Sequence, residues 1–157
     1  MNVQEEIKVL REQISASEKL LSKLEAQIKK EKEFPKVGDE YWRIDDRGSV
    51  DSFMYNNYYN DKNRQAIGNF YKTKEEAEFA VEKLKVEKEV NDFSSPFIFG
   101  RKNWYLFMDE NKQIFPIFDL DEVTYGVVYF ESREKAEEAI ETVGIERIKK
   151  YIFGEGE

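Results

Sequence analysis

Acidic side chains form the main clusters in this sequence that could carry out acid–base or metal chemistry. The chain has no histidine and no cysteine, which excludes imidazole bases, thiolate nucleophiles, disulfides and the usual nitrogen and sulfur metal ligands. The remaining candidates are the pairs Asp45-Asp46 and Asp109-Glu110 and the run that contains Asp119, Asp121 and Glu122. Both pairs fall at expected hairpin turns, where aspartate is favoured for local hydrogen bonds, and no cluster has the spacing of a calcium loop or a phosphate-binding loop. We therefore expect a protein that is not an enzyme and that has no metal and no cofactor.

A stretch rich in tyrosine and asparagine, residues 55–64, is the best candidate for a binding loop. Tyrosine offers a large rigid face at low entropic cost, and asparagine adapts its hydrogen bonds to a partner. The residues predicted to bind are Tyr55, Tyr58, Tyr59, Lys62 and Arg64, with Asp119, Asp121 and Glu122 as charged residues that steer the encounter. The alternative is that these tyrosines pack over the edge of a sheet with their hydroxyl groups in water.

The charge balance limits the class of partner. The chain has 25 basic and 33 acidic residues, for a net charge of −8, and the first 34 residues are electrically neutral. Binding to a nucleic-acid backbone depends on clustered lysine and arginine, so nucleic acid is not expected as the direct partner. The acidic remainder favours a basic protein surface, such as the DNA channel of a nuclease.

The N-terminal segment, residues 1–34, has the pattern of a coiled-coil helix. Apolar residues alternate in steps of three and four from Val3 onward, residues 4–33 contain neither proline nor glycine, and Pro35 follows. The predicted dimerisation residues are Ile7, Leu10, Ile14, Leu21, Leu24 and Ile28. Isoleucine at most a positions and leucine at d favour a parallel two-stranded coiled coil. The alternative is that this stripe packs on the chain's own folded part.

The remainder of the chain contains an internal repeat. The segment from Thr73, with alanine at position 77, aligns position for position with the segment from Ser132, with alanine at position 136. Each segment begins with a helix-capping residue, and Gly144 is expected to interrupt the second helix. The predicted fold is α+β: the coiled-coil helix followed by two tandem β-β-β-α units, residues 37–92 and 97–153, packed together.

Each repeat is expected to begin with a hairpin and a third strand. The hairpin strand 41–44 aligns with 105–108, each followed by a turn rich in Asp, Asn and Gly. Trp104 then precedes the second hairpin by one position. The third strands are expected at residues 67–71 and 127–130.

The sequence shows no apolar run of the length that a membrane span requires, and it begins with mixed charges rather than a signal sequence. The expected location is the cytoplasm of a bacterial host, without membrane association.

Several segments of the sequence together resemble small proteins of phages and prophages of Gram-positive bacteria. They are Tyr41-Trp-Arg-Ile-Asp-Asp-Arg-Gly, Gly68-Asn-Phe-Tyr-Lys-Thr-Lys-Glu-Glu-Ala-Glu-Phe-Ala, Val128-Tyr-Phe-Glu-Ser-Arg-Glu-Lys-Ala-Glu-Glu-Ala-Ile and Glu146-Arg-Ile-Lys-Lys-Tyr-Ile-Phe. The resemblance covers most of residues 36–153 and carries over no functional residue. It implies an accessory protein that binds and inhibits a host protein, such as a CRISPR nuclease or another defence effector. The alternative is a phage protein with a sequestering or regulatory role that binds a nucleotide or a nucleic acid.

Overall fold

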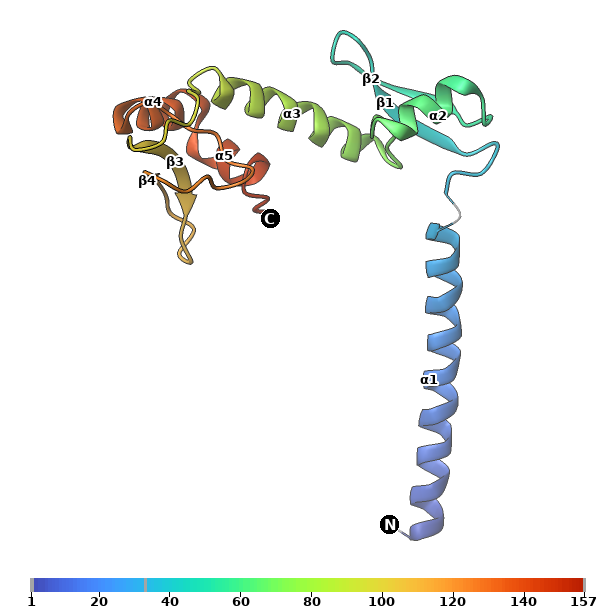
Figure 1. Ribbon diagram of the computed structural model, residues 1–157. Helices are drawn as coiled ribbons and strands as arrows, with labels where there is room; N and C mark the ends of the chain where they lie inside the picture. Colours follow the sequence, from blue (N-terminus) through green and yellow to red (C-terminus); the bar gives the residue numbers. More distant parts are fainter. Residues whose placement is uncertain (1, 33, 157) are drawn as a thin grey trace. The chain divides into compact units, whose positions relative to one another are not determined.

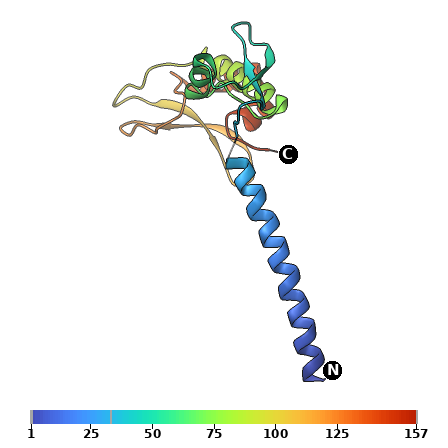
Figure 2. The same ribbon diagram turned by 90° about the vertical axis from the view of Figure 1, so that its right-hand side faces the viewer.

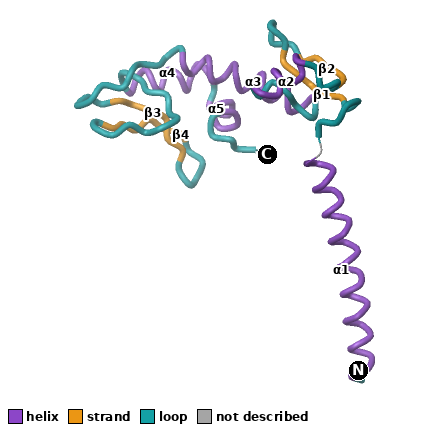
Figure 3. The backbone as a smooth tube through the Cα atoms, turned by 45° about the vertical axis from the view of Figure 1, so that its right-hand side comes forward, coloured by secondary structure: helices purple, strands orange, loops and turns teal. Residues whose placement is uncertain are grey.

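The chain is a mixed α+β protein in the computed structural model, which describes residues 2–32 and 34–156 (Figure 1). A long N-terminal helix is followed by two small two-stranded sheets and several shorter helices (Figure 3). Contacts divide the chain into two units: Met1–Arg43 with Asp51–Lys72, and Ile44–Val50 with Thr73–Glu157. Each unit is described by itself below.

Helix α1 (Val3–Lys32) is one uninterrupted helix of 30 residues (Figure 2). Glu5 and Glu6 lie in its first turn, where acidic side chains interact favourably with the helix dipole. The apolar residues of the predicted heptads are exposed along it. The structure therefore confirms the predicted helix over Val3–Lys32, while residues 1 and 33 of the predicted segment lie outside the described residues.

The first unit contains a short helix and most of a hairpin, whose turn, Ile44–Val50, is assigned to the second unit. Strands β1 (Glu40–Ile44) and β2 (Val50–Met54) form the hairpin, and helix α2 (Tyr59–Ala66) follows. Trp42 and Tyr71 exchange two backbone hydrogen bonds of 2.8 Å, which add one further bridge beside β1. Tyr41 and Tyr55 are buried, and the ring of Phe70 stacks on Tyr41 at a centroid distance of 4.0 Å. These aromatic rings form the core of this unit.

The second unit contains helix α3 (Lys74–Asn91), strands β3 (Asn103–Met108) and β4 (Ile114–Asp119), and helices α4 (Arg133–Val143) and α5 (Ile145–Tyr151). The strands are antiparallel, with Trp104 opposite Phe118 and Met108 opposite Ile114. The core draws on all three helices and both strands. Its buried residues are Val86, Val90, Leu106, Ile114, Phe130, Ala136, Ala139, Val143 and Ile148.

The backbone shows the internal repeat through one shared bridge. Trp42 pairs with Tyr71 and Trp104 pairs with Phe130, each by two reciprocal hydrogen bonds. In both cases the aromatic partner lies two residues before the residue that caps the next helix, Thr73 in one and Ser132 in the other. The hairpin, bridge and helix therefore occur in the same order in both halves of the chain.

Two details of the predicted repeat were wrong. The third strands expected at residues 67–71 and 127–130 are reduced to these single bridges, because only one residue of each segment pairs with the sheet. Trp104 lies within β3 and corresponds to Trp42 by the bridge, whereas the turns align Asp45 with Asp109. Asp45 follows Trp42 by three residues, whereas Asp109 follows Trp104 by five, so the first strand of the second hairpin is longer by two residues between bridge and turn. Because side chains alternate between the two faces of a strand, an addition of two residues leaves each side chain on the same face.

The helix ends follow the sequence signals. Thr73 accepts a hydrogen bond from the amide of Glu76, whose carboxylate in turn accepts from the amide of Thr73. Ser132 accepts from the amide of Lys135. Gly144, with φ of +94°, separates α4 from α5. These predicted caps and the predicted break are confirmed.

Helix α3 belongs by its contacts to the second unit, although the sequence repeat assigns it to residues 37–92. The reason is that Val86 and Val90 lie in the core formed with α4, α5 and β3, and Phe79 contacts Tyr151 at a ring distance of 4.9 Å. Within the part of the chain that the structure describes, no helix combines the length and apolar character needed to cross a bilayer.

Candidate functional site

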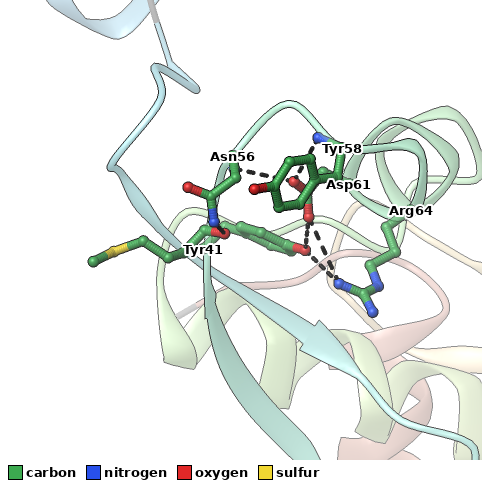
Figure 4. Close-up of polar contacts among 6 residues, drawn as sticks. Tyr41, Asn56, Tyr58, Asp61 and Arg64 are labelled. Carbon is green, nitrogen blue, oxygen red and sulfur yellow. Dashed lines mark hydrogen bonds and ion pairs between the residues drawn. The ribbon is translucent and has the colours of Figure 1, made fainter.

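A buried polar network in the first unit links β1 to α2 (Figure 4). The hydroxyl group of Tyr41 donates to Oδ1 of Asp61 at 2.8 Å and accepts from a guanidinium nitrogen of Arg64 at 2.6 Å. The same nitrogen lies 3.8 Å from Oδ1 of Asp61. The three side chains therefore form a closed triangle of polar contacts beneath α2.

Asp61 also fixes the start of α2. Its second oxygen, Oδ2, accepts hydrogen bonds from the backbone amides of Asn56 at 3.0 Å and Tyr58 at 3.1 Å. Amides before and in the first turn of a helix have no intrahelical acceptor, so a carboxylate at this position satisfies them. Asp61 is consequently only 5% exposed and accepts hydrogen bonds at both oxygens.

Opposing effects act on the pKa values in this network. Burial alone would raise the pKa of Asp61, but the hydrogen bonds from Tyr41, from the amides of Asn56 and Tyr58, and the charge of Arg64 lower it below its ordinary value. Burial raises the pKa of Tyr41, and the hydrogen bond from Arg64 only partly opposes this. Asp61 is thus held as an anion and Tyr41 as a neutral donor. The arrangement anchors α2, and neither Asp61 oxygen is left without a protein donor.

The residues predicted from the tyrosine and asparagine stretch fall into two groups. Tyr55 is buried, and Arg64 is held in the network described above. Tyr58 is 70% exposed, Tyr59 is 78% exposed, and Lys62 is also exposed. The first pair thus supports the fold, and the other three form an outer face of α2, which we call the α2 face.

The predicted acidic residues of the second unit also differ among themselves. Asp119 ends β4, and its Oδ2 accepts a hydrogen bond of 3.2 Å from the hydroxyl of Thr124. The amide of Thr124 in turn donates to the hydroxyl of Tyr129 at 2.6 Å. Asp121 and Glu122 are exposed in the following loop. Asp119 therefore orders this loop, and only Asp121 and Glu122 present their charges to solvent.

Sequence reasoning did not identify a pair of arginines around Phe53 in the first unit. The guanidinium carbon of Arg43 lies 4.3 Å from the centroid of the Phe53 ring, and that of Arg64 lies 4.8 Å from the same centroid. These distances are typical of cation–π contacts. The three residues come from β1, β2 and α2, and only the pairing of the strands brings them together.

The second unit contains a partly open cavity of about 550 Å³. Its wall is mainly apolar and includes Val90, Leu106, Phe130 and Phe153. Its polar part contains Lys83 and Glu87, whose Nζ and Oε1 atoms lie 3.8 Å apart. Among the described residues, no group of three or more acidic side chains could hold a metal ion.

Comparisons with protein-family models, with curated proteins and with solved structures found no match to this chain.

Proposed function

We propose that this chain is a non-enzymatic binding protein that self-associates through α1 and uses its α+β units to bind another protein. The observation that carries the proposal is the apolar stripe of α1. Its residues Val3, Ile7, Leu10, Ile14, Leu21, Leu24 and Ile28 are between 45% and 67% exposed. A single helix of 30 residues, about 45 Å long, gains most of its stability from packing rather than from helix propensity. A second copy of the same helix provides that packing.

The pattern of the stripe supports a parallel pair. Ile7, Ile14 and Ile28 occupy a positions and Leu10 and Leu24 occupy d positions, the arrangement that favours two parallel strands. In this register Glu6 at position g faces Arg11 at position e of the second copy. Residues 1–34 contain seven acidic and seven basic residues, so two copies of this segment carry no net charge repulsion.

The α2 face is the proposed contact for the other protein. Exposed tyrosines are enriched where protein interfaces derive most of their affinity, and Tyr58 and Tyr59 are adjacent at the start of an anchored helix. Asp121 and Glu122 are proposed to accelerate the encounter with a basic target surface. The resemblance to phage and prophage proteins favours a bacterial host protein, in particular a defence effector such as a CRISPR nuclease, as the target.

The self-association is tested by the molar mass in solution. Light scattering coupled to size exclusion should give a dimer for the wild type and a folded monomer for the double variant Leu10→Asp with Leu24→Asp. The matched control is Val9→Asp with Ala16→Asp, which adds the same charge to the same helix outside the stripe and should remain dimeric. A wild-type monomer at micromolar concentration contradicts the proposal.

The protein-binding role is tested by quantitative capture from a lysate of Gram-positive bacteria. A protein captured by the wild type should be lost with Tyr58→Ala and Tyr59→Ala, because truncating aromatic anchors often costs about 2 kcal/mol or more of binding free energy. The control is Tyr125→Ala, which removes a fully exposed tyrosine of the second unit. Equal capture by all three proteins, with unchanged circular dichroism, excludes the α2 face as the contact.

A further inference from the structure

Arg43 and Arg64 place two guanidinium groups around one partly exposed aromatic ring. Both guanidinium carbons lie within 5 Å of the Phe53 centroid, so they are separated by at most about 9 Å. Phe53 is 37% exposed, and both arginines are half-buried beside it, so the ring lies at the surface of the first unit with the two cations partly accessible. Paired guanidinium groups are the side chains best suited to bind a phosphate, because each can donate two parallel hydrogen bonds.

Arg43 has donors that the protein itself does not satisfy. Its Nε is buried and has no hydrogen-bond acceptor in the described part of the chain, and its contact with Phe53 is the one interaction the structure gives this side chain there. Arg147, by contrast, forms two hydrogen bonds to Glu89 at 2.6 and 3.0 Å. A buried donor without an acceptor is rare and unfavourable. The terminal nitrogens of Arg43 also have no acceptor in the described part of the chain and are not among its buried unpaired atoms, so they are the donors that an external anion could reach.

The charge around this pair favours a small anion over a long one. Residues 34–43 and 51–72, which form the first unit outside α1, contain five basic and four acidic residues. One of the acidic residues, Asp61, is buried in the polar network. The whole chain contains 25 basic and 33 acidic residues, and this excess would repel an extended polyanion. A ligand with one or a few phosphates avoids most of that repulsion.

We propose that Arg43 and Arg64, positioned by Phe53, form a site for the phosphate group of a small phosphorylated ligand. Arg64 is already oriented by its hydrogen bond to Tyr41, so it loses little conformational freedom on binding. Figure 4 shows Tyr58, which precedes α2, and Arg64, which lies within α2, near the same residue, Asp61. Because α2 has eight residues and is therefore about 12 Å long, an exposed tyrosine lies close enough to stack with the base of a nucleotide. This site does not depend on the proposed protein partner or on dimerisation.

Isothermal titration with three probes tests the site on the full chain: ADP, inorganic phosphate and adenosine. The wild type should bind ADP, and phosphate should compete with it, whereas adenosine should bind more weakly than ADP. Tighter binding of ADP than of phosphate identifies a nucleotide as the source of the phosphate group. Equal affinity identifies free phosphate, and both results support the site.

The variants locate the binding to Arg43. Arg43→Gln should weaken the binding of the phosphate-bearing probe about tenfold or more, because it removes charge-assisted hydrogen bonds. Arg43→Lys should lose less affinity for the probe, since lysine keeps the positive charge but lacks the planar guanidinium that donates two parallel hydrogen bonds. If Arg43→Gln unfolds at the temperature of the titration, the affinity of Arg43→Lys tests the site instead. Lys102→Gln is the matched control, because Lys102 lies 4.7 Å from the Phe118 ring in the second unit, and it should bind as the wild type does. Failure of both ADP and phosphate to bind at millimolar concentration, or equal binding by all the variants, overturns the proposal.

Discussion

The hydroxyl group of Tyr41 donates a hydrogen bond of 2.8 Å to the carboxylate of Asp61, twenty residues further along the chain. Tyr41 lies on β1, and Asp61 lies in the first turn of α2. Since both residues are buried, neither group can exchange this partner for water without opening the unit. The bond therefore links the position of α2, and with it the exposed Tyr58 and Tyr59, to the hairpin.

Removing both partners of this bond should cost less than the sum of the two separate removals. Tyr41→Phe should lower the free energy of unfolding by about 1–3 kcal/mol, because it leaves a buried carboxylate oxygen with one donor fewer. Asp61→Asn should have an effect of similar size, and the double variant should lose less than the sum of the two. Urea unfolding of the four proteins measures this coupling. Strict additivity would show that the two side chains do not interact in solution.

The stability of the first unit should fall in acid because of Asp61. The folded-state pKa of Asp61 lies below its ordinary value of 3.8, so the folded state binds this proton less tightly than the unfolded state does. Its contribution is fully present above the unfolded-state pKa and is lost as the pH falls through the folded-state pKa. The Asp61→Asn variant should therefore show a shallower loss of melting temperature between pH 5 and the acid limit of folding. Parallel pH profiles for the two proteins would contradict this assignment.

The two alanines at equivalent repeat positions should be equally intolerant of larger side chains. Ala77 on α3 and Ala136 on α4 are both fully buried, and overpacking such a position typically costs about 1–3 kcal/mol. Ala77→Leu and Ala136→Leu should each lower the melting temperature in differential scanning calorimetry. Glu141→Gln, an exposed change on α4, is the control and should have little effect. A melting temperature unchanged in either leucine variant would argue against tight packing at that position.

Gly144 should resist substitution because of its backbone conformation and not for lack of space. Its φ is +94°, and no atom lies within 4 Å of where a Cβ would stand. Gly144→Ala should thus cost on the order of 1–3 kcal/mol through backbone strain alone, measured by thermal unfolding. Gly156→Ala is the control, since Gly156 lacks a positive φ in the strained range and has equally open surroundings. Equal melting temperatures for the two variants would show that the break between α4 and α5 has relaxed.

Local signals in the sequence predicted the parts of the fold that depend on local physics. The caps at Thr73 and Ser132 and the break at Gly144 each depend on residues within a few positions. The turn at Asp45 and the turn at Asp109 are equally local, because in each the aspartate Oδ1 accepts a backbone amide four residues later. The helix of the heptads was predicted for the same reason, whereas the proposed association in pairs would be a property of two chains.

The errors concern contacts between distant segments. Helix α2 was missed because its polar sequence from Tyr59 to Ala66 has no apolar periodicity, and a carboxylate bonded to Tyr41 holds its start. The third strands were wrong because an aromatic, β-branched run does not reveal how many of its residues pair. The arginines around Phe53 depend on cross-strand neighbours, which no spacing along the chain indicates. The candidate site was therefore predictable as a segment but not as a set of contacts.

Because the two hairpins differ by two residues between bridge and turn, one hairpin could replace the other without a change in the face that each side chain occupies. A graft that replaced the hairpin from Trp42 onward by the hairpin from Trp104 onward, with the turn and the facing residues of the second strand included, would lengthen each strand by two residues, or one full pleat. Every transplanted side chain would still point to its original side, whereas an insertion of one residue would invert them all. A change of hairpin length by two residues per strand therefore keeps the assignment of side chains to the two faces, including the inward side on which Leu106 and Ile114 join the core of the second unit.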